Sequence, residues 1–191
     1  MNLTNFIGKS LGFKKALRLN FALFAHNLLL LVVIGTVTFT EGNTMPLVIG
    51  SKAPDFALLS SNGDTVRLSD FANKNSVVLI FYPGDATPGC TKQLCFIRDD
   101  FSKFEAQGAK VFGVNPADIE SHKKFAKKQN YQFPLLVDDG RKIAKLYGCD
   151  AWPMVKRTVY AIDKKGIIVF AQTGMPSNEE ILASIPGTSA P

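Results

Sequence analysis

The chain has 191 residues and 46% apolar side chains, enough for one domain with a well-filled core plus an appendage. It carries 22 basic and 16 acidic residues, and residues 1–44 hold four of the basic residues but one acid. The remainder is close to neutral, so its charge gives no reason to expect nucleic-acid binding. Three cysteines are too few for a secreted scaffold held together by disulfides.

Residues 1–44 read as a leader in front of a domain that we expect at 45–191. A stretch without charged side chains, residues 19–40, follows the basic residues, and 28–34 is uniformly aliphatic. Three interpretations stay open: an uncleaved membrane anchor with its basic end in the cytoplasm, a cleaved export or transit peptide, or translated upstream sequence with the true start at Met45. The first two predict an anchored, exported or organelle-targeted protein, and the third a cytoplasmic one.

The domain is expected to open with a hairpin and a buried strand. Residues 56–59 and 65–68 flank Asn62-Gly63, a pair typical of a tight turn between two strands. Residues 77–82 form an apolar, β-branched run, which is typical of a strand buried on both faces.

A helix carrying a cysteine in its first turn is expected next. Apolar residues spaced three and four apart indicate one face of a single continuous helix. These residues are Leu94, Ile97, Phe101 and Phe104. Gly108 is placed to end that helix in the left-handed conformation. The first turn offers Cys90 unpaired N–H groups and the positive end of the helix dipole, and both favour the thiolate form.

The rest of the chain alternates further strands and helices. Strands are expected at 110–114, 133–138, 157–162 and 167–172, and helices at 118–129, 141–147 and 178–184. We expect Ser177 to cap the last helix. His122 is predicted to be a helix-face residue with a local hydrogen bond rather than a catalyst. This order predicts an α/β, thioredoxin-like fold with a central mixed sheet flanked by helices.

The residues before Cys90 favour a reactive thiol. Read alone, an isolated cysteine is more often a small buried apolar residue. Here Cys90 closes the pattern Pro83-x-x-x-Thr87-x-x-Cys90. The Thr87 hydroxyl can donate to the sulfur or to a bound oxygen, and Pro83 stiffens the loop because its ring restricts the backbone.

This pattern resembles the active site of the peroxiredoxins, and residues 87–95, TPGCTKQLC, resemble the Q-type branch, also called bacterioferritin comigratory protein. The resemblance runs from about residue 45 to about residue 185 and includes GSKAPDF at 50–56 and KRTVY at 156–160. It implies a thiol-dependent peroxidase acting on hydrogen peroxide and organic hydroperoxides, with no metal and no organic cofactor.

The resemblance also implies residue roles. Cys90 would attack the peroxide and become a sulfenic acid, and Arg157 would stabilise the thiolate and the departing oxygen. Cys95 would resolve the sulfenic acid as a disulfide within one chain, compatible with the monomer that we expect, and thioredoxin or a similar dithiol would reduce it. Residues five apart on an intact helix lie too far apart for a disulfide, so we predict that the helix unwinds first. Cys149 is a rival resolving residue and is expected to be a bystander.

Two other functions stay open. One is a membrane-tethered thiol–disulfide oxidoreductase acting on proteins, which would normally use Cys-x-x-Cys, whereas the spacing here is Cys-x₄-Cys. The other is a peroxide sensor that relays oxidation from Cys90 to a partner. Turnover of peroxide with a thiol donor distinguishes the peroxidase from both.

Overall fold

The computed structural model describes residues 46–187. The predicted leader, residues 1–44, and its proposed membrane segment at 19–40 lie outside the described residues. Between residues 46 and 187, no helix is both long enough and apolar enough to cross a membrane.

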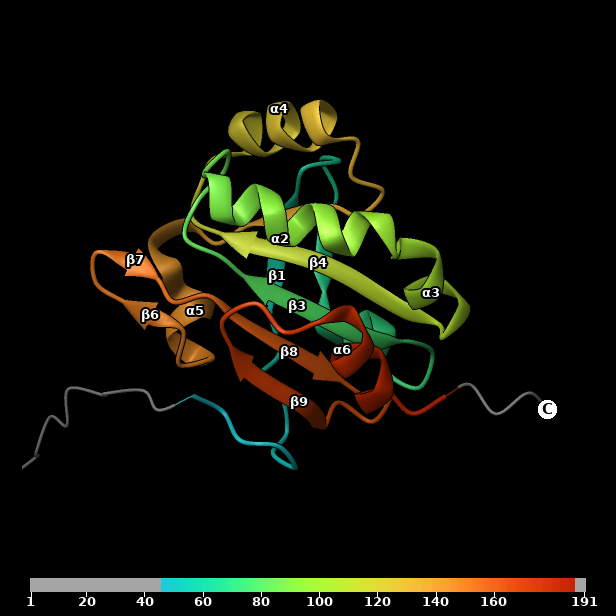
Figure 1. Cartoon of the computed structure of the whole chain (residues 1–191). Coiled ribbons are helices and arrows are strands. Elements are labelled where there is room, and N and C mark those ends of the chain that lie inside the picture. The colour runs from blue at the N-terminus through green and yellow to red at the C-terminus, as the bar shows by residue number, and fades with distance from the viewer. Residues whose placement is uncertain (1–45, 188–191) are drawn as a thin grey trace, which may run out of the picture. The chain divides into compact units, whose positions relative to one another are not determined.

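Across the residues that the structure describes, the core of the fold is a central seven-stranded β-sheet (Figure 1). Its strands are β1 (Ala57–Ser60), β2 (Thr65–Arg67), β3 (Ser76–Phe81), β4 (Ala109–Asn115), β5 (Leu135–Val137), β8 (Thr158–Ile162) and β9 (Ile168–Thr173). Their order is β2-β1-β5-β4-β3-β8-β9. In the centre, β3 pairs in parallel with β4 and antiparallel with β8, so the sheet is mixed as predicted. Every residue of β3 is buried, as its apolar run predicts.

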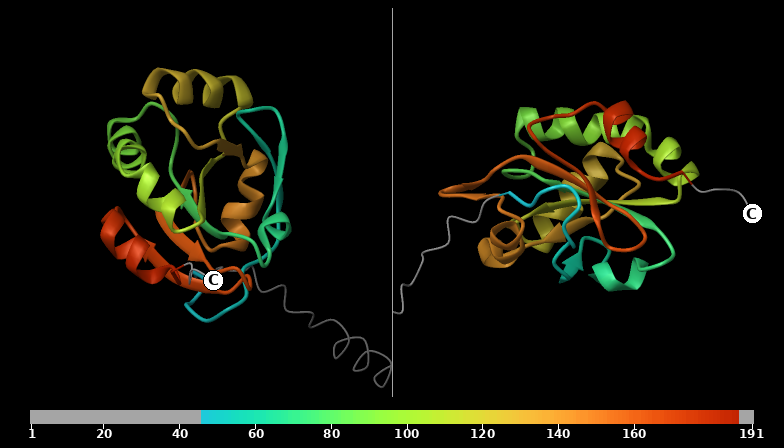
Figure 2. Two further views of the ribbon diagram at one scale, coloured as in Figure 1. Left: turned by 90° about the vertical axis from the view of Figure 1, so that its right-hand side faces the viewer. Right: turned by 90° about the horizontal axis from the view of Figure 1, so that it is seen from below.

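Helices cover both faces of this sheet (Figure 2). On one face lie α2 (Pro88–Asp99), α3 (Phe101–Ala106), α4 (Ile119–Gln129) and α6 (Asn178–Ser184), which share a core with the β3 side chains Val78 and Ile80. On the other face lie η2 (Leu68–Phe71), η3 (Asp139–Arg141) and α5 (Lys142–Leu146); Leu68 and Ala144 there share a core with Val77, Leu79 and Phe81. The alternation of side chains along β3 therefore separates two cores.

The prediction of one continuous helix across residues 90–104 is wrong at Asp100. The chain leaves the helix there, with φ −105° and ψ 12°, so that α2 ends and α3 begins. The Asp100 carboxylate accepts a hydrogen bond of 2.8 Å from the Asn178 side chain, which also donates to the Phe96 carbonyl at 2.8 Å. These contacts compete with regular helical geometry. Phe104 still packs in the same core as α2, which is why the apolar periodicity continues through the break.

The remaining elements follow their sequence signals closely. Gly108 adopts φ +67° just after α3, as expected of a glycine that ends a helix. Ser177 and Glu180 form a reciprocal capping box at the start of α6, as the predicted cap requires. A small hairpin of β6 (Asp150–Ala151) and β7 (Met154–Val155) has no counterpart in the sequence prediction.

Candidate active site

Cys90 lies at the start of α2, directly after the loop that leaves β3. Pro88 begins the helix, where a residue without an N–H costs nothing because no acceptor is available there. Thr87 is the residue that precedes the helix, and its carbonyl accepts from the Thr91 N–H at 2.9 Å. The Cys90 side chain is fully buried and packs with Leu94 in the core under α2.

Arg157 reaches this sulfur from the segment before β8. Its Nη2 donates to Cys90 Sγ at 3.1 Å, and its Nη1 donates to Gln93 Oε1. Gln93 is buried one helical turn after Cys90, and its Nε2 lies 3.5 Å from the Gly174 carbonyl oxygen. Arg157 thus places a fixed positive charge directly beside the sulfur. Sequence reasoning placed Arg157 near the thiol through the family resemblance, but it assigned no role to Gln93, although this residue lies within the TPGCTKQLC stretch.

The two other predicted loop residues, Pro83 and Thr87, lie in the same segment as Cys90. Pro83 is half-buried just after β3, and Thr87 is exposed. Among the hydrogen bonds of the described residues, none joins the Thr87 hydroxyl to the Cys90 sulfur, and this hydroxyl does not cap α2. Of the two predicted partners of the thiol, Arg157 makes a hydrogen bond to it in this structure and Thr87 does not.

Cys95 lies further along the same intact helix and is partly exposed. Its Sγ lies 3.7 Å from Gln129 Oε1 and 4.0 Å from the Tyr131 hydroxyl, so it faces the end of α4. Cys90 and Cys95 are both free thiols in this structure. A bond between them would require Cys95 to leave these contacts.

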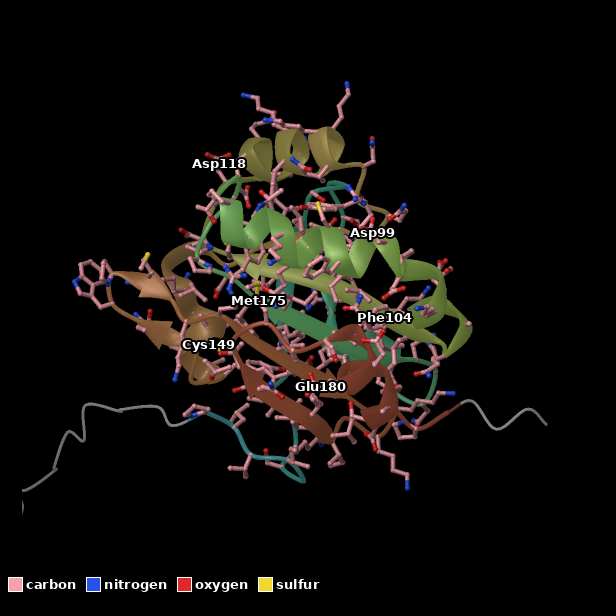
Figure 3. All side chains as sticks on the ribbon, viewed as in Figure 1. Asp99, Phe104, Asp118, Cys149, Met175 and Glu180 are labelled. Carbon is pink, nitrogen blue, oxygen red and sulfur yellow. The ribbon has the colours of Figure 1, made fainter. Side chains whose placement is uncertain are left out.

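Cys149 lies in the other core, after α5 (Figure 3). It is fully buried with Phe81 and Tyr160, on the face of the sheet opposite to Cys90. Its thiol donates to the Tyr147 carbonyl at 3.5 Å. Burial raises the pKa of Cys149 to about 11, so this thiol is neutral at physiological pH.

The loop before Cys90 holds a residue that the sequence did not single out. The Asp85 carboxylate accepts hydrogen bonds from four side chains, those of Tyr82, Asn115, Ser121 and His122. The prediction of a local hydrogen bond for His122 is wrong, because its ring is fully buried and contacts residues outside α4. The sequence analysis did not pair Asp85 with His122, which lies 37 positions further along the chain.

Within residues 46–187, no group of three or more histidine, cysteine or acidic side chains is placed to hold a metal ion.

A sequence model of the AhpC/TSA family matches residues 49–171, which is more than half of the chain. The chain belongs to the AhpC/TSA family. Its relatives in this family carry the peroxiredoxin Q and Bcp names, so the predicted membership in the Q-type branch is confirmed.

Peroxiredoxin Q of Triticum aestivum, a chloroplastic protein, is 45% identical over 124 residues, which are 63% of this chain and 57% of that protein. The chain thus spans little more than half the length of this relative. Peroxiredoxin Bcp of Bacillus subtilis (strain 168) is 41% identical over 135 residues, 65% of this chain and 84% of that protein. The crystal structure of peroxidoxin BcpB from Mycobacterium tuberculosis matches with a TM-score of 0.67 at 30% identity, covering 73% of this chain and 96% of that one. The predicted thioredoxin-like fold is confirmed.

Proposed function

We propose that the protein is a thiol-dependent peroxidase that reduces hydrogen peroxide and organic hydroperoxides through Cys90. The observation that carries the proposal is the contact of 3.1 Å between Arg157 Nη2 and Cys90 Sγ at the start of α2. A buried thiol beside a fixed guanidinium is suited to nucleophilic attack. The membership of the chain in the AhpC/TSA family agrees with that chemistry.

In the first step, the Cys90 thiolate attacks the terminal oxygen of the hydroperoxide. An S–O bond forms and the O–O bond breaks, so sulfur loses two electrons and the peroxide gains them. The departing alkoxide or hydroxide takes up a proton, which leaves a sulfenic acid on Cys90. Arg157 and the unpaired N–H groups of the first turn of α2 would stabilise the negative charge on the oxygens. The exposed Thr87 hydroxyl would bind the incoming peroxide at the mouth of the site.

In the second step, the Cys95 thiolate attacks the Cys90 sulfur. An S–S bond forms, the S–O bond breaks, and the released hydroxide becomes water. Both residues lie on α2, so the helix would unwind locally to bring the two sulfur atoms together. A dithiol reductant such as thioredoxin would then return both cysteines to thiols. Cys149 stays outside this cycle because it lies across the sheet from Cys90.

The thiol–disulfide oxidoreductase and the sensor are less well supported. Cys90 is fully buried, whereas exchange with a protein disulfide needs a thiol that a large substrate can reach. A small peroxide needs only a much narrower path to the sulfur. Since the disulfide closes within one helix, the proposed cycle runs in a monomer.

The test is single-turnover oxidation of the full chain by hydrogen peroxide and by an organic hydroperoxide, followed by intact mass. Wild type should lose two hydrogens by forming a disulfide, and Cys95→Ser should stop at a species that has gained one oxygen. Cys90→Ser should remain unoxidised, and Cys149→Ser should behave as wild type. If wild type reacts no faster than a free thiol, the peroxidase is excluded; if Cys149→Ser is the variant that stalls, Cys95 is not the resolving residue.

A further inference from the structure

A single buried carboxylate anchors the loop between β3 and Cys90. Asp85 Oδ1 accepts from the Tyr82 hydroxyl and the Asn115 amide, both at 2.8 Å. Its Oδ2 accepts from the Ser121 hydroxyl at 2.7 Å and from His122 Nδ1 at 2.9 Å. These donors come from the end of β3, the end of β4 and the first turn of α4, so one side chain joins three elements. The Asp85 side chain is 7% exposed.

His122 is held at both of its ring nitrogens. Its Nε2 lies 3.2 Å from the Leu136 carbonyl oxygen, which can only accept a hydrogen bond. Its Nδ1 faces the Asp85 carboxylate, which is likewise an acceptor. Both ring nitrogens of the fully buried His122 therefore face oxygen atoms of other elements, and one of these is the Asp85 carboxylate.

The state of Asp85 agrees with this pairing. Burial by itself would raise the pKa of the Asp85 carboxyl, but the hydrogen bonds from His122 and Ser121 outweigh burial, and the pKa is lowered from its ordinary value. The carboxylate is thus ionised at neutral pH and can accept all four hydrogen bonds.

The loop has little else to hold it. Within the described part of the chain, residues 83–86 make no backbone–backbone hydrogen bond. Ala86, next to Asp85, adopts φ +57°, a left-handed conformation that is uncommon for a residue with a Cβ. The carboxylate of Asp85 supplies the side-chain hydrogen bonds that join this segment to its surroundings. Thr87 and Cys90 follow within five residues, so their placement depends on this attachment.

We propose that the buried Asp85 carboxylate, hydrogen-bonded to His122 and three further side chains, positions the peroxide-reacting loop, holding Cys90 against Arg157 and thereby setting the rate of the first oxidation step. The inference rests on the proposed function of Cys90. Asp85 is a positioning residue, because it touches neither the sulfur nor the peroxide and acts through the loop. A displacement of about 1 Å at a reacting group can lower a rate about a hundredfold, so loss of this anchor should slow the first step about tenfold to a hundredfold.

The test compares three variants of the full chain. Asp85→Ala removes all four hydrogen bonds. Asp85→Asn keeps the shape and an oxygen that can accept from Tyr82 and Asn115, but it removes the carboxylate charge. Asp118→Asn is the matched control: Asp118 caps the start of α4 (Figure 3), and asparagine can keep that cap while removing a carboxylate from the same region.

Two measurements separate positioning from a merely structural effect. The first is the second-order rate constant for oxidation of Cys90 by hydrogen peroxide, measured with folded protein well below its unfolding temperature. The second is the pH profile of Cys90 alkylation by iodoacetamide, which reports the influence of Arg157 and does not require peroxidase activity. Loss of global stability alone would leave the alkylation profile of the folded protein unchanged.

We expect Asp85→Ala to slow oxidation about tenfold to a hundredfold and to move its alkylation profile to higher pH. Asp85→Asn should show a smaller decrease in the oxidation rate and a smaller shift of the alkylation profile than Asp85→Ala. Asp118→Asn should match wild type in both measurements. The inference is overturned if Asp85→Ala reacts within about twofold of wild type, or if Asp118→Asn slows oxidation as much. Should Asp85→Ala fail to fold, Asp85→Asn decides: a slower reaction with a shifted profile supports the inference, and wild-type behaviour overturns it. A wild type that does not react with peroxide defeats the proposed function instead, and the alkylation profiles still test the anchor.

Discussion

Arg157 Nη2 lies 3.1 Å from Cys90 Sγ, although 67 positions separate the two residues in the chain. They meet because β3, which leads to Cys90, is paired with β8, which follows Arg157. In that antiparallel pairing Phe81 is opposite Thr158. The loop that follows β3 and the segment that precedes β8 therefore lie at the same end of the two strands. The register between β3 and β8 therefore determines that the Arg157 charge lies beside the Cys90 thiol.

Replacing Arg157 tests the importance of that charge. Arg157→Met should slow oxidation of Cys90 by hydrogen peroxide about 100-fold or more, the typical cost of losing one preorganised donor to a developing oxyanion. Arg157→Lys should fall between this variant and wild type, because an ammonium keeps the charge but cannot contact Cys90 and Gln93 together. Stopped-flow or quenched single-turnover kinetics measures the rate. Lys156→Met, at the exposed neighbouring residue, is the control; an equal loss there would contradict the role of Arg157.

Gln93 should matter because it orients Arg157. Gln93→Leu keeps most of the volume but removes the acceptor for Arg157 Nη1, so the guanidinium is free to turn away from the sulfur. We expect the same oxidation step to slow about tenfold, less than in Arg157→Met, because the charge itself stays in the site. Gln172→Leu makes the same change at an exposed position of β9 and should leave the rate unaltered. A wild-type rate for Gln93→Leu would show that Arg157 needs no such support.

Cys149 should be inert toward both peroxide and alkylating agents. Its pKa of about 11 leaves about one thiol in a thousand ionised at pH 8, and the neutral thiol is a poor nucleophile. Iodoacetamide at pH 8 should therefore label Cys90 and Cys95 long before Cys149, with labelling of Cys149 rising toward pH 11. Peptide mapping by mass spectrometry measures all three sites in one sample. Detection of a Cys90–Cys149 disulfide after peroxide treatment would refute this prediction.

Oxidation should unwind the start of α2. In the reduced protein α2 runs unbroken from Pro88 to Asp99 and includes both Cys90 and Cys95. Hydrogen–deuterium exchange should show protected amides at 91–96 before peroxide is added and fast exchange once the disulfide has formed. Amides of α4 should stay protected in both states and serve as the internal control. Equal protection of α2 in a fully disulfide-bonded sample would disprove the unwinding.

Local patterns in the sequence were sufficient to predict several elements correctly. The apolar run at 77–82 predicted the buried strand β3, and Ser177 predicted the start of α6. The motif around Cys90 predicted a cysteine in the first turn of a helix. Each of these signals lies within a few residues of the feature that it specifies, because backbone propensity, capping and side-chain periodicity act over one or two turns.

The helix break at Asp100 could not be predicted in this way. The residue that bonds its carboxylate, Asn178, lies 78 positions further along the chain, at the start of α6. The apolar spacing on either side of the break is that of a continuous helix, since both halves pack in the same core. A contact between distant elements thus decided what the local pattern left undetermined.

The sequence by itself determined the fold class, the family and the place of Cys90 at a helix start, because these depend on short-range patterns and on a recognisable motif. Only the tertiary structure showed that Gln93 holds Arg157, that Asp85 pairs with His122, and that Cys149 lies across the sheet from Cys90. The reason is physical: hydrogen bonds and burial depend on distances between side chains, and strand order and register set those distances for residues far apart in the chain.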